Sequence, residues 1–279
     1  MILARSISAL TAFRNKLGRK SVGFVPTMGD LHEGHLSLIR RSNAENDATI
    51  LSIFVNPIQF NSKEDFRKYR RPEAEDLAKA RAASVDCLFM PTAGEMYSGG
   101  FQTEVSVKSL SQGLCGAHRP GHFAGVATVV LKLLNLVRPD RAYFGLKDYQ
   151  QFKLVERMAA DLALPVRIVG CPIVREADGL AMSSRNARLS PEQRRRAARI
   201  YRALQSTALM LKSKPSSANA ALRARFKSEL APDREDTIEY LELVHPDSLE
   251  PLKTARRPFL LAAAVFIGKT RLIDNILIR

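Results

Sequence analysis

Residues 22–55, VGFVPTMGDLHEGHLSLIRRSNAENDATILSIFV, contain the pattern that decides the fold. The apolar runs at 22–26 and 48–55 favour β-structure, and they are too continuous for strands that leave one face in water. Between them, apolar positions such as Leu36 and Ile39 and polar ones such as Arg40 suit an amphipathic helix of about ten to twelve residues. The segment is therefore predicted to be a βαβ unit with two buried parallel strands.

The same alternation of strands and helices continues to residue 175. Further elements are expected, in chain order, as a helix near 73–84, a strand at Val85–Met90, a helix near 124–137, a strand at Ala142–Phe144, a helix near 148–161 and a strand at Val166–Val169. This order predicts an α/β fold with a doubly wound, Rossmann-like parallel sheet, in which ligands bind beyond the carboxyl ends of the strands.

The pattern changes after residue 175, where strands and helices no longer alternate. Helices are expected near 191–213 and 217–230, followed by strand-like runs at Thr237–Val244, Phe259–Ile267 and Arg271–Ile278. We therefore predict two domains, a Rossmann-like domain at 1–175 and a smaller C-terminal α+β domain at 176–279. The polar segment 175–188, which contains Asp178-Gly179, is the expected hinge, and the C-terminal domain would act as a lid.

The composition is that of an ordinary globular protein, with 46% hydrophobic and 25% charged residues in a chain of 279. The cysteines Cys87, Cys115 and Cys171 are widely spaced, which suggests neither a disulfide framework nor a zinc site and fits a reducing cytoplasm. No apolar stretch reaches the roughly 18 residues needed to span a bilayer, so a membrane partner is not expected. The first twenty residues are basic without an acid, as in an organelle targeting segment, but a strand and a motif follow at once.

The formal net charge of +15 is compatible with a nucleic-acid partner, an anionic substrate or simple solubility. The densest basic run contains Arg194, Arg195, Arg196, Arg199 and Arg202, on an expected helix. Successive helical residues are rotated by about 100°, so this run spreads around the axis instead of forming one stripe. We interpret it as a solvated helix face and expect no nucleic-acid partner.

The first strand is followed directly by residues 27–35, TMGDLHEGH, at the place where such a sheet binds its ligand. Gly29 permits an unusual turn, and Gly34 permits close approach beside the two imidazoles. His32 and His35 are three residues apart, so on a starting helix both point to one side, where free N–H groups favour a phosphate. A pair with this spacing could also share a metal ion, although no third ligand is evident.

The longer run P-T-M-G-x-L-H-x-G-H, at 26–35, resembles the signature of the pantothenate synthetase family, in the superfamily of nucleotidyltransferases whose H-x-G-H box binds ATP phosphates. Similar segments follow in the same order: SIFVNPIQF at 52–60, RPGHF at 119–123, FGLKDYQQ at 144–151, DGLAMSSRN at 178–186 and LIDN at 272–275. The resemblance implies a homodimer that condenses (R)-pantoate with β-alanine at the expense of ATP. Pantoyl adenylate would be the intermediate, and AMP and pyrophosphate would be released.

The resemblance also implies roles for individual residues. An anionic carboxylate must approach a polyphosphate, so adenylation needs fixed positive groups where charge develops. The implied catalytic residues are His35 as proton donor, with His32 and Lys147 at the phosphates. Gln59 and Gln151 would bind pantoate, and Gln59 would also contact β-alanine. The implied ATP-binding set is Met28, Gly29, Asp30, Leu31, His32, Glu33, Gly34, His35, Gly145, Leu146, Lys147, Asp148, Val174, Met182, Ser183, Ser184 and Arg185.

Several of these roles have alternatives. Ser183 and Ser184, taken alone, are typical of ordinary turn residues. The pair Arg119 and His122 either orients the leaving pyrophosphate or shapes its own loop. Magnesium is implied for the triphosphate, and the acidic pair of the family falls on Glu75 and Asp76, which otherwise suit a helix surface.

The chain departs from the family pattern at several positions. Leu146 stands where the family commonly has Glu, which leaves ribose or loop positioning in question if that carboxylate matters. Arg70 replaces a frequent proline, and Lys79 lies one turn after the acidic pair, where a neutral polar residue would have helped a metal. These changes weaken the metal geometry more than the reaction.

Two other functions remain as alternatives. One is a different H-x-G-H nucleotidyltransferase that adenylates a phosphate and releases no AMP, so the identity of the products separates it from the ligase. The other is a basic nucleic-acid-binding protein, whose affinity would fall steeply with salt. Against the second, the sequence contains no Trp and no aromatic clusters among its basic runs.

Overall fold

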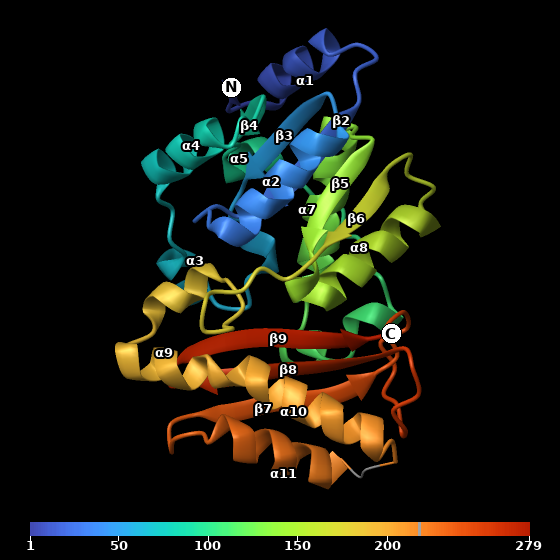
Figure 1. Cartoon of the computed structure of the whole chain (residues 1–279). Coiled ribbons are helices and arrows are strands. Elements are labelled where there is room, and N and C mark those ends of the chain that lie inside the picture. The colour runs from blue at the N-terminus through green and yellow to red at the C-terminus, as the bar shows by residue number, and fades with distance from the viewer. Residues whose placement is uncertain (217–218) are drawn as a thin grey trace.

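The computed structural model describes residues 1–216 and 219–279, which form one unit around a six-stranded sheet and a second around a three-stranded sheet (Figure 1). The strands of the first sheet are all parallel, in the order β1-β4-β3-β2-β5-β6. They are β1 (Ile2–Ala4), β2 (Val22–Thr27), β3 (Ala48–Ile53), β4 (Cys87–Phe89), β5 (Arg141–Gly145) and β6 (Arg167–Cys171). The strand order reverses between the neighbours β2 and β5, which confirms the predicted doubly wound α/β sheet.

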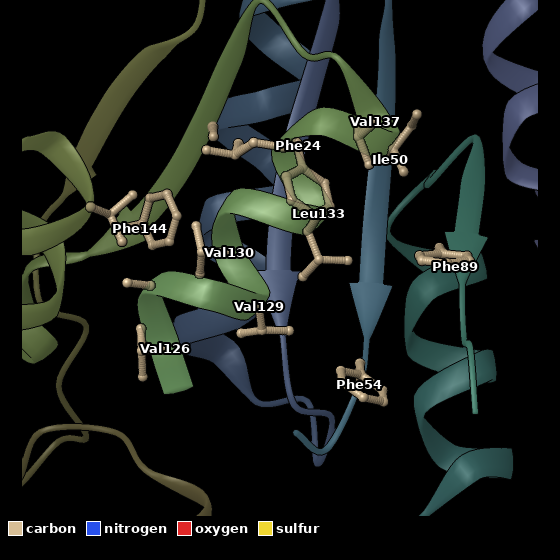
Figure 2. Close-up of a cluster of buried hydrophobic side chains, with 14 of the residues drawn as sticks. Phe24, Ile50, Phe54, Phe89, Val126, Val129, Val130, Leu133, Val137 and Phe144 are labelled. Carbon is tan, nitrogen blue, oxygen red and sulfur yellow. The ribbon is translucent and has the colours of Figure 1, made fainter. Parts of the chain in front are cut away.

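Helices cover both faces of this sheet. One face carries α1 (Ile7–Lys16), α7 (His122–Val137) and α8 (Tyr149–Asp161), and the other carries α2 (Glu33–Glu45) and α4 (Glu73–Ala82). Because side chains alternate along β2, Phe24 packs in the core with α7, whereas Val25 packs in the core with α2. Figure 2 shows the first core, where Phe24 lies close to Leu133. Burial on both faces explains the continuous apolar strands.

The basic N-terminal segment forms two elements that the sequence patterns did not predict. Ile2 of β1 pairs with Cys87 of β4, and Leu10 of α1 is fully buried. The Nε group of Arg14 donates a hydrogen bond of 3.0 Å to the carbonyl of Val137 at the end of α7. This segment is thus part of the fold. A three-residue strand and a helix with a single buried residue give almost no periodic signal.

The second unit packs helices against an antiparallel sheet of order β7-β8-β9, and this confirms the predicted α+β character. Its elements are α9 (Pro191–Ala197), α10 (Arg199–Ser213), α11 (Asn219–Leu230), β7 (Thr237–Val244), β8 (Phe259–Ile267) and β9 (Thr270–Ile278). The single helix expected at 191–213 is two helices, which meet at Ala198 while its backbone stays right-handed helical (φ −60°, ψ −20°). The helix start expected at 217–218 lies outside the described residues.

Strand β8 attaches the second unit to the first. Leu261 and Val265 belong to the core beneath α10 and α11, whereas Leu260 and Ala262 pack on the opposite face with Tyr149 of the first unit. Because both faces are buried, the strand is apolar throughout (FLLAAAVFI). The sheet of the second unit therefore lies directly against the loops of the first (Figure 1).

Short helices occupy several connections. They are α3 (Lys63–Lys68), α5 (Ala93–Met96), α6 (Cys115–His118) and the 3-10 turns η1 (Pro57–Gln59), η2 (Ser109–Ser111), η3 (Leu146–Asp148) and η4 (Ser184–Arg188). All three cysteines are buried free thiols. Among the described residues, no helix is both long and apolar enough to cross a bilayer.

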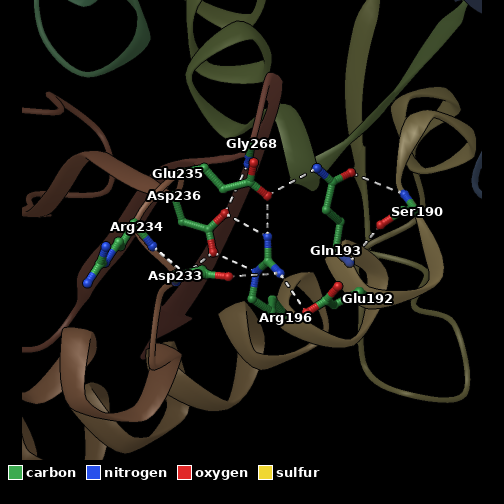
Figure 3. A network of polar contacts seen from close by, with 9 residues as sticks. All are labelled: Ser190, Glu192, Gln193, Arg196, Asp233, Arg234, Glu235, Asp236 and Gly268. Carbon is green, nitrogen blue, oxygen red and sulfur yellow. Dashed lines mark hydrogen bonds and ion pairs between the residues drawn. The ribbon is translucent and has the colours of Figure 1, made fainter.

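The arginine run at 194–202 differs from the expected solvated face. Arg196 is buried, and its Nε donates a hydrogen bond of 2.8 Å to Asp236 within a network of acids (Figure 3). Arg194 forms an ion pair of 2.6 Å with Glu176 of the hinge segment. Only part of the run, such as Arg195, is exposed. These arginines hold the second unit and the hinge segment together.

Candidate active site

The site lies where β2 and β5 separate. The two strands pair only at Gly23↔Arg141 and Phe24↔Ala142, although both continue further. The N–H of Asp140 donates to the carbonyl of Val22 at 2.9 Å, so the even-numbered residues of β2 direct their backbone groups toward β5. Pro26 has no N–H to give on that side, and the pairing stops before it. A crevice therefore opens at the carboxyl ends of these strands, as expected for this topology.

The crevice holds a cavity of about 210 Å³ and opens into two adjoining cavities of about 180 and 60 Å³ that share wall residues with it. Three segments form much of its wall, namely the loop after β2 with the start of α2, the loop after β5 and the hinge segment, and Gln59, Tyr69, Arg119 and His122 add to it. The structure brings the following predicted residues together there: Met28, His32, Gly34, His35, Gln59, Gly145, Lys147, Asp148, Gln151, Val174, Met182, Ser183, Ser184 and Arg185.

The H-x-G-H segment places its two imidazoles side by side. His32 is the N-cap of α2, and the ring centroids of His32 and His35 are 4.0 Å apart. The backbone N–H of His32 points to Nδ1 of His35 at 3.4 Å, so the neutral His35 ring carries its proton on Nε2. A Cβ on Gly34 would lie 2.9 Å from both Cε1 and Nδ1 of His32. Glycine is therefore required for the His32 ring to fold back over the helix start.

Both imidazoles are kept neutral by their surroundings. Burial, together with the nearby Lys147 ammonium, lowers the pKa of His32 to about 4. Burial also lowers the pKa of His35 well below its usual value, with His32 and Lys147 as additional causes. The pair is therefore uncharged at neutral pH, and each neutral ring keeps one N–H group that can donate a hydrogen bond to an anion.

The turn before the histidines is held by Asp76. Its Oδ2 accepts the N–H of Asp30 at 2.8 Å, and its Oδ1 accepts the N–H of Leu31 at 2.7 Å. Gly29 (φ +83°) lies so close that a Cβ there would come within 2.9 Å of Asp76 Oδ2. Gly29, Asp30 and Leu31 therefore shape the site and do not line the cavity, and Glu33 turns away to pair with an arginine.

The acidic pair predicted for magnesium is engaged in contacts within the protein. Both carboxylate oxygens of Asp76 are occupied by backbone N–H groups, and the residue is only 1% exposed. Burial raises the pKa of Asp76. Glu75 instead accepts from Arg70 at 2.9 Å, and Lys79 donates to the carbonyl of Leu31 at 2.7 Å. Among the described residues, no group of three or more His, Cys, Asp or Glu side chains could hold a metal.

The turn after β5 presents Lys147 and Asp148 to the crevice. The Nζ atom of Lys147 lies 3.6 Å from Oδ2 of Asp148. The Leu146 side chain does not line the main cavity and packs against the apolar cluster between the two units. At this position the departure from the family's glutamate thus adds an apolar contact. The neighbouring residues Gly145 and Lys147 line the cavity, whereas Leu146 does not.

The hinge segment supplies the third wall. Ser183 caps η4, because its Oγ accepts the N–H of Arg185 at 3.3 Å, and the same residue also lines the cavity. The N–H of Met182 donates to the carbonyl of Val174 at 3.0 Å, which folds the segment back on itself. Among the described residues, none accepts a hydrogen bond from the guanidinium of Arg185. Burial and the neighbouring Arg119 lower its pKa.

Arg119 and His122, whose role the sequence left open, both line the crevice. Arginine can only donate, so the 3.0 Å contact from Nη1 of Arg119 requires that Nε2 of His122 accept. Nδ1 of His122 must then carry the proton, which it donates to the carbonyl of Gln59 at 2.8 Å. Burial, with help from Arg119, lowers the pKa of His122 to about 4. The neutral imidazole thus orients the guanidinium.

Gln59 and Gln151 lie in the part of the crevice that widens into the cavity of about 180 Å³. Asn56 donates to Oε1 of Gln59 at 3.0 Å, which fixes the orientation of that amide. Val129 and Leu133 of α7 form an apolar wall of this cavity. Tyr69 also lines it, a residue that the sequence did not single out because no motif surrounds it.

The start of α2, two neutral imidazoles and the basic side chains of Lys147, Arg119 and Arg185 meet at the switch point of a parallel sheet. Together they define a nucleotide-binding α/β enzyme of the H-x-G-H class. The family model described as pantoate-beta-alanine ligase matches residues 3–277. The chain belongs to the pantoate-β-alanine ligase family.

Known relatives cover the chain almost completely. A pantothenate synthetase from Caldicellulosiruptor bescii is 49% identical over 280 residues (100% of this chain and 99% of the relative). Another, from Sulfurihydrogenibium sp., is 52% identical over 92% of each chain. The solved structure of pantothenate synthetase from Thermus thermophilus superposes with a TM-score of 0.92 at 45% identity, covering 99% of both chains. The pantoate-beta-alanine ligase of Francisella tularensis, solved with β,γ ATP and β-alanine, gives 0.83 at 36% identity, with 99% and 97% covered.

Proposed function

We propose that the chain joins (R)-pantoate to β-alanine at the expense of ATP, through pantoyl adenylate, with release of AMP and pyrophosphate. The observation that carries this proposal is the convergence of His32, His35, Lys147 and Arg185 on one crevice in a chain of this family. A carboxylate attacks the α-phosphate of ATP only if the negative charge of both partners is offset, and this crevice offers that compensation.

ATP would lie along the loop after β2, with its phosphates at the start of α2. The Nε2–H of His35 would donate to the phosphate where charge accumulates, while Lys147 and Arg185 approach from the other two walls. Asp148 would accept from a ribose hydroxyl. The activated acyl group needs no covalent attachment to the protein, because the adenylate itself carries the activation to the amine of β-alanine.

Pantoate would occupy the cavity beside Gln59 and Gln151. The molecule combines hydroxyls and a carboxylate with two geminal methyl groups, and this cavity combines side-chain amides with an apolar wall that includes Val129 and Leu133. Amides can bind hydroxyl and carboxylate groups without competing as nucleophiles. β-Alanine would then reach the adenylate past Gln59.

We further propose that magnesium enters with the triphosphate and is not held by Glu75 and Asp76, since the oxygens of Asp76 are engaged by backbone N–H groups. The proposed division of the chain at residue 176, with the C-terminal part acting as a lid, agrees with the hinge segment forming one wall of the crevice. A cytoplasmic homodimer that binds neither nucleic acid nor membrane completes the proposal.

His35→Ala tests the assignment directly. The variant should keep its thermal stability but lose most of its pantoate-dependent pyrophosphate release, because the neutral donor at the phosphate is gone. His118→Ala is the matched control, since this exposed histidine does not line the main cavity. Full activity of His35→Ala would refute the proposed role of His35 as hydrogen-bond donor to the phosphate. A product mixture with pyrophosphate but without AMP, even with β-alanine present, would favour a different H-x-G-H nucleotidyltransferase.

A further inference from the structure

Asn275 of β9 reaches across from the second unit to the turn that carries Lys147. Its Nδ2 donates to the carbonyl of Leu146 at 2.9 Å and to the carbonyl of Lys147 at 3.0 Å, 128 residues earlier in the chain. Asn275 is only 6% exposed and lies on the wall of the cavity of about 60 Å³ that adjoins the main one. One amide group thus ties down two successive carbonyls next to the crevice.

The turn that Asn275 holds has no side-chain cap, although the Leu146 side chain packs against the apolar cluster between the two units. The 3-10 turn η3 spans Leu146–Asp148, and its N-cap residue, Gly145, has no side chain with which to cap it. Short 3-10 turns have poor internal hydrogen-bond geometry, so their orientation depends on outside contacts. A lysine ammonium at the end of a flexible stem is positioned no better than the backbone from which it starts. The two hydrogen bonds from Asn275 therefore fix the backbone from which the Lys147 side chain extends.

Asn275 is itself held by a buried ion pair. Its own N–H donates to Oδ1 of the preceding Asp274 at 2.8 Å. Asp274, 4% exposed, receives two hydrogen bonds from Arg175, at 2.6 and 2.9 Å. The Arg175 guanidinium lies 3.5 Å from the ring centroid of Tyr201, and it also donates to the carbonyl of Gly179 at 3.1 Å. The same assembly thus restrains both the β5 turn and the hinge segment.

We propose that Asn275 is a positioning residue for adenylation, through which the second unit fixes the Lys147 turn against the phosphates. This inference rests on the proposed function. The apolar contacts of β8 already attach the two units, so Asn275 is not needed merely to keep them together. Its contribution is the placement of a cation, where an error of about 1 Å can cost about 100-fold in rate.

A double-mutant cycle with Lys147 tests the proposal. Adenylation is measured as pantoate-dependent pyrophosphate formation in single-turnover reactions with enzyme in excess, which resolves slow rates. Asn275→Ala should lower the rate about 10-fold or more in the unsubstituted protein but less than about 2-fold in a Lys147→Ala background, because the positioned group is then absent. Asn275→Leu, of similar volume and without a donor, should behave in the same way if Asn275→Ala folds poorly.

The matched control is Asn43→Ala, which also removes an asparagine that donates to a distant carbonyl, that of Ala83 at 2.9 Å, but away from the crevice. It should leave the rate unchanged. Equal rate losses from Asn275→Ala in both backgrounds, or no loss in the unsubstituted protein, would overturn the positioning role. Absence of pantoate-dependent pyrophosphate formation in the unsubstituted protein is a separate result, which would overturn the proposed function as well.

Discussion

Replacing Gly34 by alanine should separate catalysis from stability. The added methyl group would lie 2.9 Å from Cε1 and Nδ1 of His32, and ordinary contacts of this kind begin at about 3.4 Å. The methyl group would also face the Cβ of Met182, 3.8 Å away, so the hinge segment limits relaxation in that direction. The His32 ring must therefore move, and this displaces the adjacent His35 ring, whose centroid lies 4.0 Å away.

The expected size of the effect follows from that movement. A shift of about 0.5 Å in a catalytic group is half the displacement that can cost about 100-fold, so kcat/KM for adenylation should fall roughly 10-fold or more. Stability should change little. Gly34 is helical and its φ is not positive, so alanine gains up to about 1 kcal/mol of helix propensity, which offsets the contact with the ring.

Pantoate-dependent pyrophosphate exchange measures the rate, and thermal unfolding measures stability. We expect a melting temperature within about 3 °C of the parent together with the loss of exchange. Gly94→Ala is the matched control, because this helical glycine has only the Thr92 Oγ1 atom nearby, at 3.9 Å. A Gly34→Ala protein with parental exchange activity, or one that loses activity only because it unfolds, would contradict the proposed effect of the His32 ring position on catalysis.

Three further predictions concern groups around the crevice. Asp76→Asn turns one acceptor into a donor that faces a backbone N–H, so urea unfolding should show a loss of about 1–3 kcal/mol; parental stability with an altered magnesium requirement would instead favour a metal ligand. The pKa of His122 is about 4 in the folded protein, against a usual value of 6.5, so the unfolded chain binds more protons between these pH values. The free energy of unfolding should therefore fall as the pH drops from about 6.5 to 4. In His122→Gln this slope should be shallower, and an unchanged slope would contradict the assignment. Arg185→Ala should slow adenylation about 10-fold or more while pantoate affinity changes less than about 2-fold, and a dominant affinity loss would place Arg185 at pantoate.

Much of the fold was predictable because strands buried on both faces leave long apolar runs in the sequence. The runs at 22–26 and 48–55 are such strands, and β8 is another. The edge strand β1 is three residues long and α1 buries only Leu10, so neither produces a pattern. The break at Ala198 leaves the backbone helical, and a hydrophobic pattern cannot register so small a change.

The site was predictable where a motif names its residues and less so where contacts are long-range. His32 and His35 are recognisable from their spacing, and the structure places them on the crevice wall. The engagement of Asp76 by the N–H groups of Asp30 and Leu31 joins positions about 45 residues apart and has no signature in the acidic pair itself. The contact between Asn275 and the Lys147 turn likewise depends on the two units meeting.

The most direct test of the account is the set of products formed from ATP and pantoate before β-alanine is added. We predict that purified protein with magnesium forms pyrophosphate and a bound pantoyl adenylate, and that AMP and pantothenate appear only after β-alanine is supplied. Formation of pyrophosphate without any requirement for pantoate, or of pantothenate without AMP, would contradict the adenylate mechanism.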